Sequence, residues 1–212
     1  MRAPRALYPA TLDLGGATVV VVGAGAVALR KLQGLPRGLR RIKVLAPGVS
    51  GPLRQWAKAR PEVEIIQRGF EGGDLRGSRV LFCCADDAEV NAFAARQARA
   101  LGIWVCQASA PNEGDLHVPA VVRAGGAQMT LSTGGASPAM ARALRAHFEK
   151  ALKASDLGWF LEQLEALRPA MKSDPALAAR LRKRLGDPGT VEKALAPRSK
   201  AGRARLQAVL KP

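Results

Sequence analysis

The sequence is poor in aromatic residues, which make up 4% of its 212 residues. It is also short of acidic residues, since 17 Asp and Glu stand against 33 Lys and Arg, and the formal net charge is +16. Proteins that bind single-stranded nucleic acid combine basic charge with aromatic stacking platforms. The scarcity of aromatics therefore argues against nucleic acid as a partner. The charge fits a small polyanionic ligand or a solvated surface.

Long apolar runs are missing as well, and no stretch of 18 or more apolar residues occurs, so we expect no membrane span. The first nine residues contain two arginines but no apolar signal core. The cysteines are Cys83, Cys84 and Cys106, an odd number in apolar runs whose spacing suits neither a disulfide framework nor a metal site. These absences predict a cytoplasmic protein without a structural metal.

One glycine motif organises the chain. Val19–Val22 predicts a strand that is buried on both faces. Gly23, Gly25 and Ala28 follow in the spacing of the dinucleotide-binding motif, with Ala in its third position, and residues 27–35 predict a helix. Gly23 would allow the tight turn, Gly25 would let a pyrophosphate approach the backbone, and Ala28 would let the helix pack closely. The alternative is a strand-to-helix turn without a ligand.

The first half of the chain predicts a doubly wound α/β sheet. After the glycine motif, predicted strands alternate with predicted helices: strands at 41–47, 63–66, 79–85 and 103–108, and helices at 52–60 and 88–101. We also expect a short lead-in strand in residues 11–16. Ligands of such sheets bind at the carboxyl ends of the strands.

Two loops at this edge bear on cofactor binding. The loop after the second strand contains Pro47 and Gly48 where an acidic residue often selects NAD, so the residues alone leave the choice between NAD and NADP open. Asp86 and Asp87 follow the 79–85 strand. They serve either as helix caps, with Asp87 capping the helix that follows, or as part of a loop beside the cofactor.

The second half follows a different pattern. Strands at 116–123 and 127–132 flank Gly125–Gly126 and predict a hairpin. Ser137 followed by Pro138 predicts the start of a helix that runs to about residue 153. From residue 156 onward the pattern is helical, with expected breaks at the prolines of that region, Pro169, Pro175, Pro188 and Pro197.

Four stretches together resemble the precorrin-2 dehydrogenase and sirohydrochlorin ferrochelatase family of sirohaem synthesis. They are GAGAVALRK at 23–31, ADDAEVN at 85–91, DLHVPA at 115–120 and STGGASPAMARALR at 132–145. Their order and spacing agree with the family over about residues 10–150. The resemblance is to the dehydrogenase–chelatase part of sirohaem synthases, and we expect no methyltransferase domain.

The resemblance implies an architecture and an activity. It implies an NAD-binding Rossmann domain (residues 1–113), a small α+β dimerisation segment (114–150) and a helical C-terminal domain (151–212). It further implies a homodimer that oxidises precorrin-2, a tetrapyrrole, to sirohydrochlorin with NAD. Some members also insert Fe²⁺, and that activity stays open here. A precorrin-2 molecule carries eight carboxylates, which a basic protein would attract.

Motif and resemblance together give two sets of candidate binding residues. The cofactor candidates are Gly23, Gly25, Ala26, Val27, Pro47, Gly48, Ala85 and Asp86. The substrate candidates surround a helix start whose N–H groups suit carboxylates, and they are Ser132, Thr133, Gly134, Gly135, Ser137 and Arg142. The alternative for the second set is a capped turn.

The chain departs from the family at its favoured catalytic residue. The family's strand ends in N-V-V-D-x-P, and here Cys106 stands in the Asn position and Ser109 in the Asp position. A serine is a poor general base without an activating partner, so Ser109, Asp115 and His117 are the catalytic candidates. The departure also favours an alternative function, a catalytically reduced paralogue that binds NAD or a tetrapyrrole as a sensor or carrier.

Overall fold

The structure is a computed structural model that describes residues 6–124 and 126–211. Its contacts divide the chain into two compact units, Met1–Val118 and Pro119–Pro212. The finer division into 1–113, 114–150 and 151–212 stays a prediction. Among the described residues no helix is long and apolar enough to cross a membrane.

The first unit is built on a parallel sheet, as the sequence predicts. Its described residues form five strands in the order β3-β2-β1-β4-β5. The strands are β1 (Thr18–Val22), β2 (Arg41–Leu45), β3 (Val63–Ile66), β4 (Ser78–Cys83) and β5 (Trp104–Gln107). The chain moves outward from β1 to β3 and then returns to place β4 on the other side of β1. The topological switch point therefore lies between β1 and β4.

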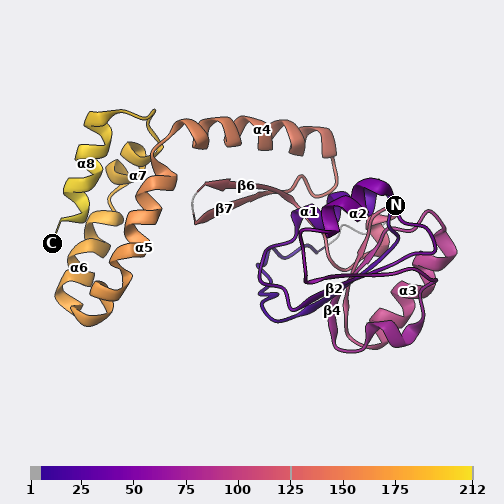
Figure 1. Cartoon of the computed structure of the whole chain (residues 1–212). Helices are drawn as coiled ribbons and strands as arrows, with labels where there is room; N and C mark the ends of the chain where they lie inside the picture. The colour runs from indigo at the N-terminus through magenta and orange to yellow at the C-terminus, as the bar shows by residue number, and fades with distance from the viewer. Residues whose placement is uncertain (1–5, 125, 212) are drawn as a thin grey trace. The chain divides into compact units, whose positions relative to one another are not determined.

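Helices cover both faces of this sheet (Figure 1). Val19 and Val21 pack in one core with α1 (Ala26–Gly34) and α2 (Gly51–Ala57), and Val20 and Val22 pack in another with α3 (Ala88–Ala100). All four valines are almost fully buried. Burial on both faces is the reason that this strand shows no polar alternation. Short 3₁₀ segments at Gly72–Leu75 and Pro111–Glu113 precede β4 and follow β5.

The second unit joins a hairpin to a set of helices (Figure 1). The antiparallel strands β6 (Ala120–Ala124) and β7 (Ala127–Leu131) confirm the predicted hairpin, and the Gly125 half of its expected turn lies outside the described residues. The long helix α4 (Pro138–Ala154) packs against β6. The remaining helices are α5 (Leu157–Ser173), α6 (Pro175–Leu185), α7 (Pro188–Leu195) and α8 (Lys200–Leu210).

The junction between α4 and α5 is held by residues of α8 and of the connection that precedes it. Asp156 is almost fully buried and accepts a 2.8 Å hydrogen bond from Arg203 Nε. Arg198 Nε donates to the carbonyl of Ser155 at 2.8 Å, and Ser155 forms a β-bridge with Pro197. Because a buried carboxylate is costly without a partner, Arg203 is needed for this junction to close.

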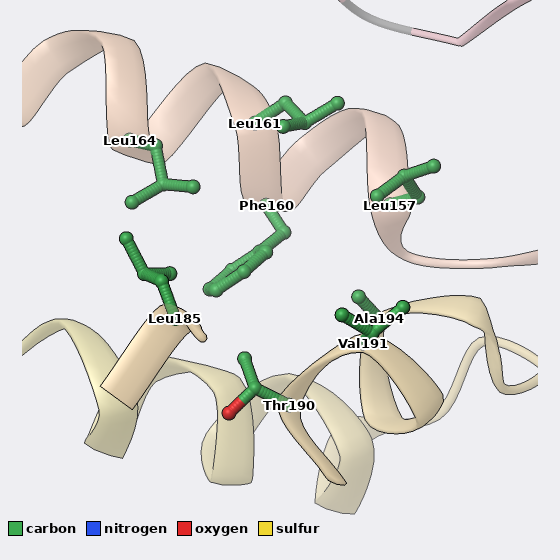
Figure 2. A pocket seen from close by; sticks show the side chains of 8 residues that line it. All are labelled: Leu157, Phe160, Leu161, Leu164, Leu185, Thr190, Val191 and Ala194. Carbon is green, nitrogen blue, oxygen red and sulfur yellow. The ribbon is translucent and has the colours of Figure 1, made fainter. Parts of the chain in front are cut away.

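A cavity of about 210 Å³ lies among these helices, between Phe160 of α5 and the α6–α7 region (Figure 2). Its lining is apolar apart from Thr190, whose hydroxyl donates to the carbonyl of Arg184 at 2.9 Å. A cavity without charged or free polar groups is a poor fit for a polycarboxylate.

Three sequence expectations about elements are wrong. Residues 11–14 form no strand, and Gly15 instead donates to Asp13 Oδ1 at 2.9 Å within a turn. Residues 116–119 lie outside β6, because Asp115 and Leu116 donate both of their N–H groups to Val105. Pro169 lies inside α5, which continues to Ser173. Pro175 and Pro188, in contrast, open α6 and α7 as helix-initiating prolines.

Candidate functional site

The switch point brings the loops after β1 and β4 into direct contact. Gly23 N donates to Leu45 O at 2.8 Å, and Cys84 N donates to Val22 O at 2.7 Å. Gly23 has a φ of +105°, and a Cβ on it would lie 2.4 Å from the carbonyl oxygen of Cys84. Both the dihedral and the close approach therefore require glycine at this position.

Gly25 and Ala28 meet the other two requirements of the motif. Ala28 is fully buried between α1 and the sheet. A Cβ on Gly25 would meet no described atom within 4 Å. Packing therefore does not explain the glycine, and the open space over it fits a ligand that approaches the backbone.

The N-terminus of α1 faces this space with uncapped N–H groups. Gly25 is the N-cap, no described side chain caps the helix, and its first turn holds no acidic residue. The first intrahelical bond is donated by Leu29 to Gly25 O. The earlier N–H groups, which include those of Ala26 and Val27, together with the helix dipole favour an anion such as a pyrophosphate.

The loop after β2 lies beside the glycine loop. Ser50 N donates to Ala24 O at 3.1 Å, and this bond fixes the exposed Pro47 and Gly48 near the same edge. The Ser50 hydroxyl is buried and has no hydrogen-bond partner among the described residues. Ser50 carried no role in the sequence predictions.

Asn91 of α3 holds the loop after β4. Its side chain accepts from Ala85 N at 3.0 Å and donates to Ala85 O at 2.8 Å, and only 3% of the residue is exposed. Asp87 caps α3 by accepting from Glu89 N and Val90 N, which confirms the predicted cap. Asp86 is exposed beside it. Asn91 was missed as a functional residue, although a polar residue on the sheet-facing side of a helix is its sequence signal.

The three catalytic candidates lie on the segment that follows β5. Ser109 is exposed and lies two residues beyond the strand. The residue before it, Ala108, donates its N–H to Cys83 O at 3.1 Å. Asp115 returns to the middle of β5 by donating its N–H to Val105, and its carboxylate pairs with Arg99 at 3.4 Å. His117 is half-buried. Ser109 is therefore the candidate at the carboxyl edge, whereas Asp115 is held by a cation beside the strand.

The three cysteines are free and buried. Burial raises the pKa of Cys83 and of Cys84 to about 12. Burial also raises the pKa of Cys106, against the charge and the hydrogen bond of the Lys31 ammonium. These thiols are neutral at physiological pH. No cluster of three or more His, Cys, Asp or Glu side chains suited to a metal ion occurs in the described part of the chain.

The six substrate candidates lie together in the second unit, on the loop before α4 and on its first turns. Gly134 and Gly135 have φ values of +62° and +90°, and Cβ atoms on them would meet no described atom within 4 Å. Ser137 caps α4 by accepting from Met140 N. Thr133 exchanges two hydrogen bonds with the Ser137 backbone, Ser132 Oγ accepts from Gly134 N, and Arg142 is exposed. The hydroxyls shape the loop, which leaves backbone groups and Arg142 to meet a ligand.

The chain is similar to known NAD(P)-binding proteins and to siroheme synthases. A family model described as "Putative NAD(P)-binding" matches residues 10–120. The siroheme synthase of Gluconacetobacter diazotrophicus is 37% identical over 151 residues, which cover 69% of this chain and 32% of that protein. The siroheme synthase of Thioalkalivibrio sulfidiphilus is 29% identical over 206 residues, 96% of this chain and 42% of that protein.

A solved structure, that of SirC, precorrin-2 dehydrogenase, shares the fold. It aligns with a TM-score of 0.72 and 24% sequence identity over 96% of this chain and 98% of its own. The Rossmann-type prediction and the resemblance to the dehydrogenase part of siroheme synthases are thereby confirmed. The chain spans about a third of the length of the first siroheme synthases it matches.

Proposed function

From the premise that the chain belongs to the NAD(P)-binding family whose model covers residues 10–120, we propose that it oxidises precorrin-2 to sirohydrochlorin with NAD. The observation that carries the proposal is the switch-point loop. Gly23 is locked against Cys84, while Gly25 leaves open space in front of uncapped helix N–H groups. Similarity to siroheme synthases supports the choice of substrate.

The proposed binding of NAD follows from the loops at this edge. The N–H groups of Ala26 and Val27 hold the pyrophosphate, and the loop of Pro47 and Gly48 flanks the adenosine half of the cofactor. Neither an acidic residue nor an arginine selects the ribose in that loop. The loop of Ala85 and Asp86 flanks the other half of the cofactor.

The oxidation removes one hydride and one proton from the substrate, which loses two electrons. The nicotinamide supplies the hydride acceptor. In our proposal Ser109 donates a hydrogen bond to the substrate rather than acting as a base, and the proton leaves to water. Asp115 is a weaker candidate because Arg99 already holds its carboxylate. His117 is the remaining titratable candidate on this segment.

The substrate loop is proposed to bind carboxylates of the tetrapyrrole. Gly134 and Gly135 expose backbone at the start of α4, and Arg142 adds a cation one turn later. The net charge of +16 favours encounter with a molecule that carries eight carboxylates.

An anaerobic assay tests this function. Purified protein is mixed with precorrin-2 and NAD, and sirohydrochlorin is followed by absorbance while NADH is followed by fluorescence. We expect equal amounts of both products, since one hydride is transferred for each substrate molecule. Absence of turnover by a protein that still binds NAD in a titration would falsify the dehydrogenase proposal.

Iron insertion is proposed as a weak second activity, with Fe²⁺ as a substrate. Insertion requires a group that accepts two pyrrole protons, and the family's Asp position is Ser109 here. We expect Ser109→Asp to accelerate sirohaem formation from sirohydrochlorin and Fe²⁺, with NADH formation changed less than twofold. Equal iron insertion by both proteins would remove Ser109 from this step.

The same serine favours one alternative, a paralogue that binds NAD or a tetrapyrrole without turnover. In that case Ser109→Asp would not create dehydrogenase activity, and both ligands would still bind in separate titrations. Turnover by the wild-type protein excludes the alternative.

We also propose a homodimer formed through the second unit. None of the 17 residues of α4, all of them described, is buried, and Met140 is 53% exposed. The hairpin beside it has two strands, and a two-stranded sheet is marginally stable alone. A second copy would cover these apolar side chains.

A cytoplasmic location stays part of the proposal, and the three buried free thiols suit that reducing compartment.

A further inference from the structure

Lys31 is a half-buried cation on the side of α1 that faces the sheet. It lies three residues after Ala28 and directly before Leu32, both of which are fully buried. Side chains on a helix tilt toward its N-terminus. The stem of Lys31 therefore carries its ammonium back toward the carboxyl edge of the sheet, where α1 begins.

The ammonium reaches the second half of the sheet. It lies close enough to Cys106 on β5 and to Cys84, which follows β4, for its charge to oppose the rise in the pKa of these thiols that burial causes. In the sheet, β4 and β5 lie on one side of β1. Strands β2 and β3, on the side proposed to bind the adenosine half of the cofactor, lie on the other. The cation therefore lies on the nicotinamide side of the switch point.

Lys31 has no carboxylate partner among the described residues. Among the ion pairs formed by residues 6–124 and 126–211, none includes Lys31. The neighbouring thiols are neutral at physiological pH and do not balance its charge. A half-buried cation whose charge no described carboxylate balances favours an anionic ligand.

We propose that Lys31 binds a carboxylate of the tetrapyrrole substrate at the carboxyl edge of β4 and β5. This inference rests on the proposed function, because it concerns the substrate of that reaction. The cofactor also contains anionic groups, but the uncapped N–H groups at the N-terminus of α1 already offer its pyrophosphate a site.

Binding titrations separate the two anions. We would measure NAD and the stable octacarboxylate uroporphyrin by quenching of tryptophan fluorescence, with wild type, Lys31→Met, Lys31→Gln and Lys31→Arg. Removing the charge is expected to weaken uroporphyrin binding about tenfold, as for a hydrogen bond to a charged group. NAD affinity should stay within twofold, and Lys31→Arg should restore most of the uroporphyrin affinity.

Lys58 provides the matched control. It is an exposed lysine at the C-terminal end of α2, at the opposite edge of the sheet, and the described ion pairs do not include it. Lys58→Met removes the same net charge and should leave both affinities unchanged. Equal loss of uroporphyrin binding in Lys58→Met and Lys31→Met would reduce the effect to overall charge and overturn the proposal.

Further outcomes distinguish this inference from the proposed function. Loss of NAD binding in Lys31→Met and Lys31→Gln, with melting temperatures near the wild-type value, would assign the cation to the cofactor instead. Wild-type uroporphyrin affinity in both variants would also overturn the inference, while turnover of precorrin-2 by wild type would still support the function. With precorrin-2 and NAD, we expect KM to rise about tenfold and kcat to change little, the pattern of lost ground-state binding.

Discussion

Gly23 and Gly25 belong to one motif, but the two positions require glycine for different reasons. Gly23→Ala would place a methyl group 2.4 Å from the Cys84 carbonyl at a φ of +105°. We expect the substitution to lower the free energy of unfolding by about 3 kcal/mol or more, because both neighbours are backbone. Chemical denaturation without cofactor measures this loss.

Gly25→Ala should behave in the opposite way. Its φ of −87° suits alanine, and the new methyl group would meet no described atom within 4 Å. We expect unchanged or slightly greater stability without cofactor and at least tenfold weaker NAD binding, because the methyl group occupies the approach to the pyrophosphate. Wild-type NAD affinity in Gly25→Ala would argue that the loop is only a turn.

The buried thiols give a pH dependence at the residue scale. Cys83 and Cys84 have pKa values raised to about 12 in the folded chain, from an ordinary value of 9.0. Above pH 9 the unfolded chain loses these protons first, so the folded state binds more protons and stability falls as pH rises toward 12. Thermal unfolding across this range should show the fall, and Cys83→Ala with Cys84→Ala should reduce it.

Reaction with a thiol reagent is a second test of the burial of the three cysteines. At pH 8 the native protein should react slowly at Cys83, Cys84 and Cys106, and unfolded protein should react at all three. Rapid reaction of the native protein would contradict the buried placement.

At the scale of elements, one side chain couples α3 to the loop after β4. Asn91→Ala would leave the N–H and the C=O of Ala85 without their partner. We expect a loss of about 2 kcal/mol in unfolding free energy and weaker NAD binding, because the loop that precedes Asp86 loses its anchor. Asn91→Asp keeps the acceptor and should retain part of the stability, which separates the hydrogen bond from simple packing.

The elements of the first unit could be predicted because local patterns agree with the fold. The run Val19–Val22 identifies the central strand, and Asp87 identifies the start of α3. The missing lead-in strand is instead a local turn in which Gly15 donates to Asp13, whereas the shorter β6 depends on the hydrogen bonds that Val105 O accepts from Asp115 and Leu116. The position of Ser50 beside the glycine loop could not be predicted, since it depends on which loop lies opposite it in the folded chain. Asn91 could have been singled out as a polar residue on the sheet-facing side of its helix, but its bonds to Ala85 could not.

At the scale of the whole molecule, the proposed dimer makes Met140 a direct probe. Met140 is 53% exposed on α4, so Met140→Glu should leave the folding of one chain nearly unchanged. A charge buried between two copies would be costly, and we expect the mass from sedimentation equilibrium to fall from two chains to one. Lys150→Glu, which changes an exposed position of the same helix, is the control. A single-chain mass for wild type would contradict the dimer.

The overall charge predicts a salt dependence of substrate capture. With a net charge of +16 and an octacarboxylate substrate, long-range attraction raises the encounter rate and is screened by salt. We expect kcat/KM for precorrin-2 to fall several-fold between about 20 mM and 300 mM ionic strength. The affinity for NAD, which carries less charge, should change less, and an equal change for both would point to a general effect of salt.

The junction between α4 and α5 sets an order of events during synthesis. Asp156 is closed by Arg203, which leaves the ribosome 47 residues later. The strands of the first unit need no residue of this junction, so the NAD(P)-binding part can fold while α5 is still emerging. Until Arg203 arrives, the carboxylate of Asp156 stays hydrated and the helices of the second unit lack their closing contact. A nascent chain stalled before that arginine would therefore have a folded first unit and an incompletely folded second unit that proteases and chaperones can bind.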